Sequence, residues 1–184
     1  MEFTKSKVQL VDSKITNFEI ALNLSEEQEV KFDPAVLEEY NIEYDIAYHQ
    51  LGELDDNANI RQTNYDGNAI AVGLNIYINY DEENPKEGYM IRMDAAAIFK
   101  VKFHGEKEEE IAIEMFENYI TATSVIIGFI RSYLENATSH YPIEKYVLPV
   151  GNSEKIVTDY FDQLGEEMGI DDDDVKDLFS DLDD

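Results

Sequence analysis

Hydrophobic and polar residues alternate along four stretches of the chain, which is the pattern of strands that bury one face. The longest alternation covers residues 89–103, where every odd position is apolar. Three shorter alternations precede it, at residues 18–24, 42–48 and 70–80. We therefore predict four strands. The polar loop at 81–88, which contains proline and glycine, predicts a hairpin between the last two.

Two later stretches change to helical spacing. Over residues 114–139 apolar positions recur every three or four residues, which predicts a long amphipathic helix. The acidic stretch 108–113 before it fits either a last piece of strand or the start of the helix. Ser153 can cap a second helix, whose apolar face holds Ile156, Val157, Tyr160, Phe161 and Leu164. Residues 35–40, between the first two strands, predict a short helix or an extended crossing of the sheet.

Four strands followed by two helices predict an α+β fold, with a four-stranded antiparallel sheet and a long and a shorter helix packed on one face. The 184 residues suffice for one domain with a sizeable core. We predict this domain at residues 1–165 and an acidic tail at 166–184. The tail is expected to be disordered. The alternative is a docking helix, because Val175, Leu178, Phe179 and Leu182 share one helical face.

The charge of the chain is strongly one-sided. Lysine and arginine number 14 and aspartate and glutamate 41, a net charge of −27. This charge argues against nucleic-acid binding and favours basic or unfolded cationic partners.

Three compositional features predict the compartment. The chain has no cysteine, which excludes disulfides and thiolate metal sites and suits a reducing compartment. No apolar segment follows the N-terminal lysines as in a signal peptide. The most apolar stretch, residues 125–130, is well short of the ~20 residues of a membrane span. We expect a cytoplasmic protein without membrane insertion.

No arrangement of reactive residues in the sequence predicts catalysis. The three histidines, His49, His104 and His140, have no companion at metal-ligand spacing. The sequence contains neither a Gly-rich phosphate loop nor a Gly-x-Ser-x-Gly turn. The run 171–174 lacks the turn glycine and the final glutamate of a calcium-binding loop. We therefore expect neither an enzyme nor a bound metal or cofactor.

The order of elements, together with four short motifs, resembles the SecB-like protein-export chaperones over roughly residues 14–164. The motifs are Ala97-Ile98-Phe99 late in the fourth strand, Phe129-Ile130-Arg131 in the long helix, Tyr141-Pro142 after it, and Leu148-Pro149-Val150 before the second helix. The chain departs from the family pattern at Ala97, where the family has glycine, and at Gly128, where it often has proline.

The resemblance implies a client-binding groove between the second strand and the second helix. Carried onto this chain, its residues are Ile42, Tyr44, Ile46, Val157, Tyr160, Phe161 and Leu164. The same spacing is also that of ordinary core residues. The long helix has further apolar residues beyond its main stripe, Ile126, Phe129 and Tyr133. These either complete the core or contact a second subunit, and the resemblance, to a family of dimers of dimers, favours the contact.

The function that the resemblance implies is that of an ATP-independent holdase, a chaperone that binds non-native or pre-secretory polypeptides through an apolar aromatic groove. It would act in protein export or in a toxin–antitoxin system, with a translocase motor or an antitoxin as a further partner. The charge supports an alternative from another class, an acidic decoy that mimics DNA and occupies the binding site of a basic protein.

Overall fold

The computed structural model describes residues 8–23, 34–51, 69–80, 86–102, 108–141 and 143–168. Its elements in chain order are β1 (Val8–Asn23), the 3-10 helix η1 (Pro34–Glu39), β2 (Ile42–Leu51), β3 (Ala69–Ile78), β4 (Gly88–Val101), α1 (Glu108–Thr138) and α2 (Ser153–Met168). The predicted tail positions 175–182 lie outside the described residues.

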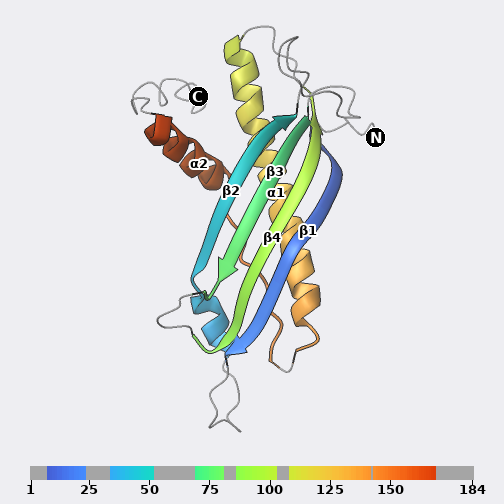
Figure 1. Ribbon diagram of the computed structural model, residues 1–184, viewed down its shortest axis with the longest axis vertical. Coiled ribbons are helices and arrows are strands. Elements are labelled where there is room, and N and C mark those ends of the chain that lie inside the picture. Colours follow the sequence, from blue (N-terminus) through green and yellow to red (C-terminus); the bar gives the residue numbers. More distant parts are fainter. Residues whose placement is uncertain are drawn as a thin grey trace, which may run out of the picture.

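The four strands form one antiparallel sheet in the order β1-β4-β3-β2, so β1 and β2 are its edges. In Figure 1, α1 runs along one face of the sheet and α2 lies beside β2. The predicted α+β fold is confirmed. The stretch 108–113 belongs to α1, and the predicted short helix at 35–40 is η1. Helix α2 continues to Met168, beyond the predicted domain boundary at 165.

Strand β1 begins at Val8, ten residues before the predicted start of its alternation at Phe18. Two register shifts in its pairing with β4, between Leu10 and Asp12 and between Ile15 and Asn17, each insert one residue. Each inserted residue reverses the alternation of the two faces. A search for strict alternation therefore finds only the part of β1 that follows the second bulge.

The core lies between the sheet and α1. The odd positions of β4, from Tyr89 to Val101, face the helix and are buried. The even positions of β3 also face the helix and are buried. From α1, the buried row Ala122, Ile126, Ile130 and Leu134 meets them. These residues are four apart, so they form one line along the helix.

Helix α1 also bears on the membrane prediction. The most apolar run, residues 125–130, is short. The whole segment Glu110–Thr138, however, is long and apolar enough to cross a membrane by length and composition alone. A core helix passes the same test, and Ile126, Ile130 and Leu134 are buried in the core of this domain.

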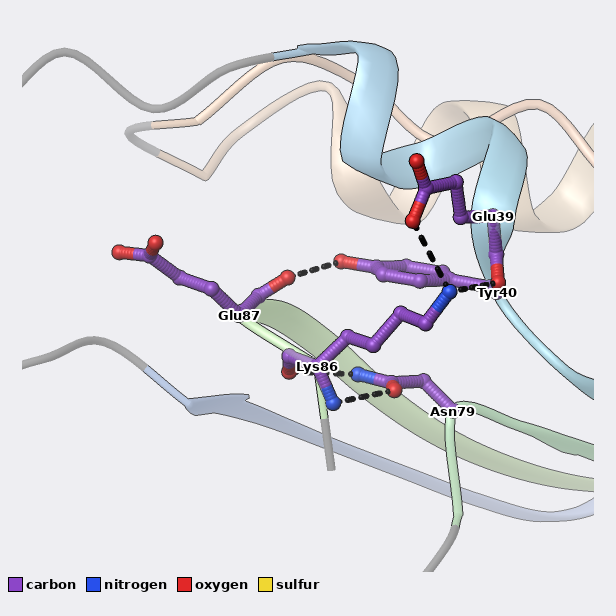
Figure 2. Close-up of polar contacts among 5 residues, drawn as sticks. All are labelled: Glu39, Tyr40, Asn79, Lys86 and Glu87. Carbon is purple, nitrogen blue, oxygen red and sulfur yellow. Dashed lines mark hydrogen bonds and ion pairs between the residues drawn. The ribbon is translucent and has the colours of Figure 1, made fainter. Parts of the chain in front are cut away.

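A network of hydrogen bonds joins β3 to β4 at the end of the sheet where β2 begins (Figure 2). The backbone of Asn79 is in the left-handed region, with φ 55°, a conformation that asparagine tolerates better than most residues. The Asn79 Nδ2 donates to the carbonyls of Lys86 at 2.8 Å and Tyr89 at 2.7 Å, and its Oδ1 accepts from the Lys86 N–H at 2.8 Å.

The short helix η1 is tied to the same corner. The Tyr40 hydroxyl donates to the Glu87 carbonyl at 2.9 Å and accepts from the Tyr89 N–H at 2.7 Å. The Lys86 ammonium donates to the Glu39 carbonyl at 2.6 Å and pairs with its carboxylate at 3.0 Å. Together these contacts fix the point at which the chain enters β2.

Candidate functional site

Strand β2 turns its even positions toward the helices, and their exposure depends on how closely the helices approach. Tyr48, beside α1, is buried, and Ile46 is only 7% exposed. Tyr44 lies on the same face, yet 40% of its surface is exposed. Because α2 packs mainly on α1, it leaves this part of β2 uncovered. An apolar groove therefore runs between β2 and α2.

Two pockets mark this groove. The first has a volume of about 200 Å³ and is lined by Ile42, Tyr44, Leu74, Ile76, Ile127, Leu148, Pro149, Gly151 and Ile156. The second has a volume of about 230 Å³ and is lined by Asp45, Ile46, Tyr160, Gln163 and Leu164. The first pocket is almost entirely apolar, whereas the second has Asp45 and Gln163 in its wall.

A polar contact crosses the groove between β2 and α2. The Tyr44 hydroxyl donates to Asp159 Oδ2 at 3.4 Å, and Asp159 is also paired with Lys155, whose Nζ lies 2.7 Å from its carboxylate. Partial burial and the Asp159 carboxylate raise the pKa of Tyr44. Hydrogen bonding to Asp159 raises the pKa of Lys155. The contact is long and partly solvated, so an occupant of the groove can displace it at small cost.

The floor of the groove is a cluster of aromatic rings. Tyr48 lies 4.6 Å from Tyr119, 4.9 Å from Tyr160 and 6.4 Å from Phe161 between ring centroids. The Tyr48 hydroxyl shares a 2.6 Å hydrogen bond with Thr123 Oγ1. Burial raises the pKa of both Tyr48 and Tyr119, which keeps them neutral. Aromatic contacts of this kind make the floor well packed and apolar.

The seven residues predicted for the groove lie on β2 and α2, and they divide into three groups. Ile42, Tyr44, Ile46, Tyr160 and Leu164 line the pockets. Phe161 belongs to the aromatic floor and lines neither pocket. Val157 is fully buried in the core and lines neither pocket. The apolar face of α2 is wider than the part of it that faces the groove.

Several pocket residues were not predicted. Leu74 and Ile76 come from β3, Ile127 from α1, and Leu148 and Pro149 from the segment before α2. The sequence placed all of them in apolar stretches. Nothing in their spacing indicates, however, that β3 and α1 reach the wall of a groove at the edge of the sheet.

The three residues predicted to contact a second subunit also divide. Ile126 is 1% exposed and belongs to the core, which is one of the two roles that its spacing allowed. Phe129 is partly buried against the core. Tyr133 is 37% exposed, and its ring meets that of Phe18 edge-on, with centroids 5.3 Å apart. Val125 is exposed on the same helix.

The histidines give no sign of a metal centre in the described part of the chain. His49 and His140 are exposed, and His104 lies outside the described residues. Within the described residues, no group of three or more histidine, aspartate or glutamate side chains is arranged to hold a metal ion.

Comparison with known proteins finds similarity among solved structures. No protein-family model matches the chain, and no curated protein matches it. Among solved structures, the chain is similar to a Mycobacterium tuberculosis SecB-like chaperone in complex with a ChAD peptide from the HigA1 antitoxin. The TM-score is 0.47 at 16% identity, over 78% of this chain and 87% of that chain. A likeness at this level says nothing about function.

Proposed function

We propose that this protein is an ATP-independent holdase that binds non-native polypeptides in the groove between β2 and α2. The observation that carries the proposal is the uncovered groove itself. Tyr44 faces the helices but is 40% exposed, and pockets lie beside it at Ile42 and at Ile46. Because the described helices leave this apolar side of β2 partly exposed, it is a candidate binding surface.

The lining of the groove suits many different occupants. Aromatic and aliphatic side chains form contacts with any apolar side chain, because these contacts have little directional preference. The rim is acidic, with Glu43 and Asp45 on β2 and Asp159 and Asp162 on α2, and all four lie at least partly exposed. Such a rim favours segments that carry lysine or arginine beside their apolar residues. The clients we propose are pre-secretory polypeptides or an antitoxin.

Suppression of aggregation tests this function. A chemically unfolded enzyme is diluted into moderate salt with and without an equimolar amount of the protein, and light scattering is followed. We expect scattering to fall for the natural chain and to return with Tyr44→Ala. The matched control is Tyr80→Ala, because Tyr80 has the same exposure, 39%, but lies outside the groove. Unchanged scattering with the natural chain would refute the holdase function.

The net charge of −27 supports a second candidate, the acidic decoy that occupies a basic protein's binding site. Ionic strength separates the two functions. Binding of a decoy depends on exposed charges and should collapse at high salt. Capture of clients by apolar contacts should largely persist. A capture activity that disappears at high salt and is insensitive to Tyr44→Ala would favour the decoy.

A further inference from the structure

The two edges of the sheet differ in their fitness to pair with another strand. Strand β1 is interrupted by two bulges, at Leu10/Asp12 and at Ile15/Asn17. Bulges twist an edge and break the regular row of main-chain groups that another strand would need. Strand β2 pairs with β3 through ten consecutive residues without a shift. The regular edge of the sheet is therefore β2.

The register shows which main-chain groups of β2 point outward. The Asn79 N–H donates to the Asn41 carbonyl at 2.8 Å. These two residues stand opposite each other, one pair before Ile42 and Ile78. In an antiparallel pair, hydrogen-bonded residues alternate with residues whose main-chain groups point away. The odd positions of β2 therefore bond to β3, and the even positions turn their N–H and C=O groups to the free edge.

The even positions are also those whose side chains line the groove. Ile42, Tyr44 and Ile46 all line its pockets. In the described part of the chain, no residue bonds to the outward main-chain groups of Tyr44 or Ile46. The groove thus offers apolar pockets and a row of unpaired donors and acceptors along the same residues.

We propose that a client segment binds in extended form as a fifth strand, pairing its main chain with the free edge of β2. The proposal rests on the proposed function and specifies its mode of recognition. Main-chain pairing is independent of sequence, so it gives affinity for many clients, while the pockets add preference for apolar side chains. The added strand displaces the 3.4 Å contact between Tyr44 and Asp159.

The charges at this edge specify the occupant further. Side chains of an added strand alternate between the groove and the outer face of the sheet. On the outer face they come next to Glu43 and Asp45, which are both exposed. Opposite charges on neighbouring strands attract. The favoured segment therefore alternates apolar residues, which face the groove, with lysine or arginine, which face these carboxylates.

Backbone methylation tests the proposal. The probe is a dye-labelled nine-residue peptide with tyrosine or valine at odd positions and lysine at even positions. Two further versions carry N-methyl groups on the odd or on the even amides. In an antiparallel fifth strand, the residues that face the groove also donate to β2. We expect odd methylation to weaken binding roughly tenfold or more through lost hydrogen bonds, and even methylation to change it less than about twofold.

The outcomes separate the proposal from the function on which it rests. Loss confined to the even amides would make the added strand parallel to β2 and would still support main-chain pairing. Equal effects of the two methylations, with the parent peptide bound, would overturn the fifth strand and leave the holdase function standing. A parent peptide that does not bind would overturn the fifth strand. The aggregation measurement then decides the function by itself.

Amide hydrogen exchange gives a second readout that needs no variant. With the parent peptide bound, the N–H groups of Tyr44 and Ile46 should become protected. Those of Glu43 and Asp45, which already bond to β3, should change little. Protection that fails to appear at Tyr44 and Ile46 at saturating peptide would overturn the proposal.

Discussion

Tyr48 and Tyr146 are both buried, yet they differ in the hydrogen bonding of their hydroxyls. The Tyr48 hydroxyl has Thr123 as its partner at 2.6 Å. Within the described residues, the Tyr146 hydroxyl has none. Burial raises the pKa of both. Because a buried hydroxyl without a partner opposes folding, the same change at the two positions should have different effects.

We expect Tyr146→Phe to leave the free energy of unfolding unchanged or to raise it by about 1 kcal/mol, since it removes an unpartnered polar atom. Tyr48→Phe should lower it by about 1 kcal/mol, because it leaves the Thr123 hydroxyl buried without its partner. Urea unfolding at neutral pH measures both. A larger loss for Tyr146→Phe than for Tyr48→Phe would show that the Tyr146 hydroxyl is hydrogen-bonded.

The buried tyrosines also predict how stability depends on pH. Burial raises the pKa of Tyr89 to about 12. It also raises the pKa values of four further tyrosines above their ordinary value of about 10, namely Tyr40, Tyr48, Tyr119 and Tyr146. Below pH 10 both states hold these protons, so the tyrosines add no pH dependence. Above pH 10 the unfolded chain loses them first. The free energy of unfolding then falls as pH rises, by up to about 1.4 kcal/mol per pH unit for each such tyrosine.

Urea midpoints between pH 8 and pH 11.5 measure this fall, and Tyr146→Phe should make it shallower. A midpoint that stays constant through pH 11 would mean that the tyrosines ionise alike in both states.

Burial of individual residues is the part of the structure that the sequence predicts least well. The helical spacing identified Ile126 and Val157 as apolar but left open whether each lies in the core or on a surface that binds a partner. The resemblance favoured the surface, whereas both are in the core. When the apolar face of a helix is wide, the sequence does not indicate which of its residues face the core. The positions of the sheet and of the other helix decide which residues along that arc are covered.

At the scale of elements, the corner that joins η1 to β3 and β4 depends on one side chain. The Asn79 amide makes two hydrogen bonds to Lys86, in the β3–β4 connection, and one to Tyr89 in β4. Its backbone has φ 55°. Both Asn79→Gly and Asn79→Ala remove these hydrogen bonds. Glycine adopts the left-handed region without a Cβ clash, whereas alanine keeps the Cβ and lacks the tolerance of asparagine for this region.

We expect Asn79→Gly to lower the free energy of unfolding by about 2 kcal/mol and Asn79→Ala by about 1 kcal/mol more. Asn75→Ala, on the outer face of β3, is the control and should have little effect. Urea unfolding of the three variants gives the comparison. Equal losses for alanine and glycine would mean that the backbone at this position carries no strain.

Helix α1 has an apolar side that is partly exposed among the described residues. Val125 and Tyr133 are 39% and 37% exposed, and Phe129 lies between them along the helix. We propose that this side contacts a second copy of the chain. Val125→Glu should then shift the protein toward monomer in sedimentation velocity, because it places a charge in an apolar interface.

The control for this variant is Thr158→Glu, which adds the same charge at an exposed position of α2. An identical sedimentation profile for the natural chain and Val125→Glu would remove this side of α1 as a subunit contact.

Elements with an uninterrupted period are those that the sequence predicted correctly. β3, β4 and α2 keep one period throughout, and their centres were all found. The first ten residues of β1 were missed, because two inserted residues reverse its alternation. The groove between β2 and α2 was predicted from a resemblance to a family and not from periodicity, which gives the faces of elements but not the distances between them.

At the scale of the whole molecule, the net charge of −27 acts on the rate of encounter. A field of one sign attracts lysine-rich clients from a distance, and salt screens it. We expect the association rate of the lysine-rich peptide to fall roughly tenfold between low and high salt, with a dissociation rate that changes little. Stopped-flow fluorescence measures both. If salt changed the dissociation rate and not the association rate, the charges would act only in the bound state.

The burial of Ile46, 7% exposed beneath the groove, limits how the binding preference of this protein can change over generations. A residue that supports the fold and also shapes the site cannot vary freely, because a substitution that alters the pocket also lowers stability. Tyr44 and Leu164 also line the pockets, but they are more exposed than Ile46 and are therefore less constrained. Divergence among descendants of this chain should concentrate at these two positions, and a laboratory selection for new clients should begin there.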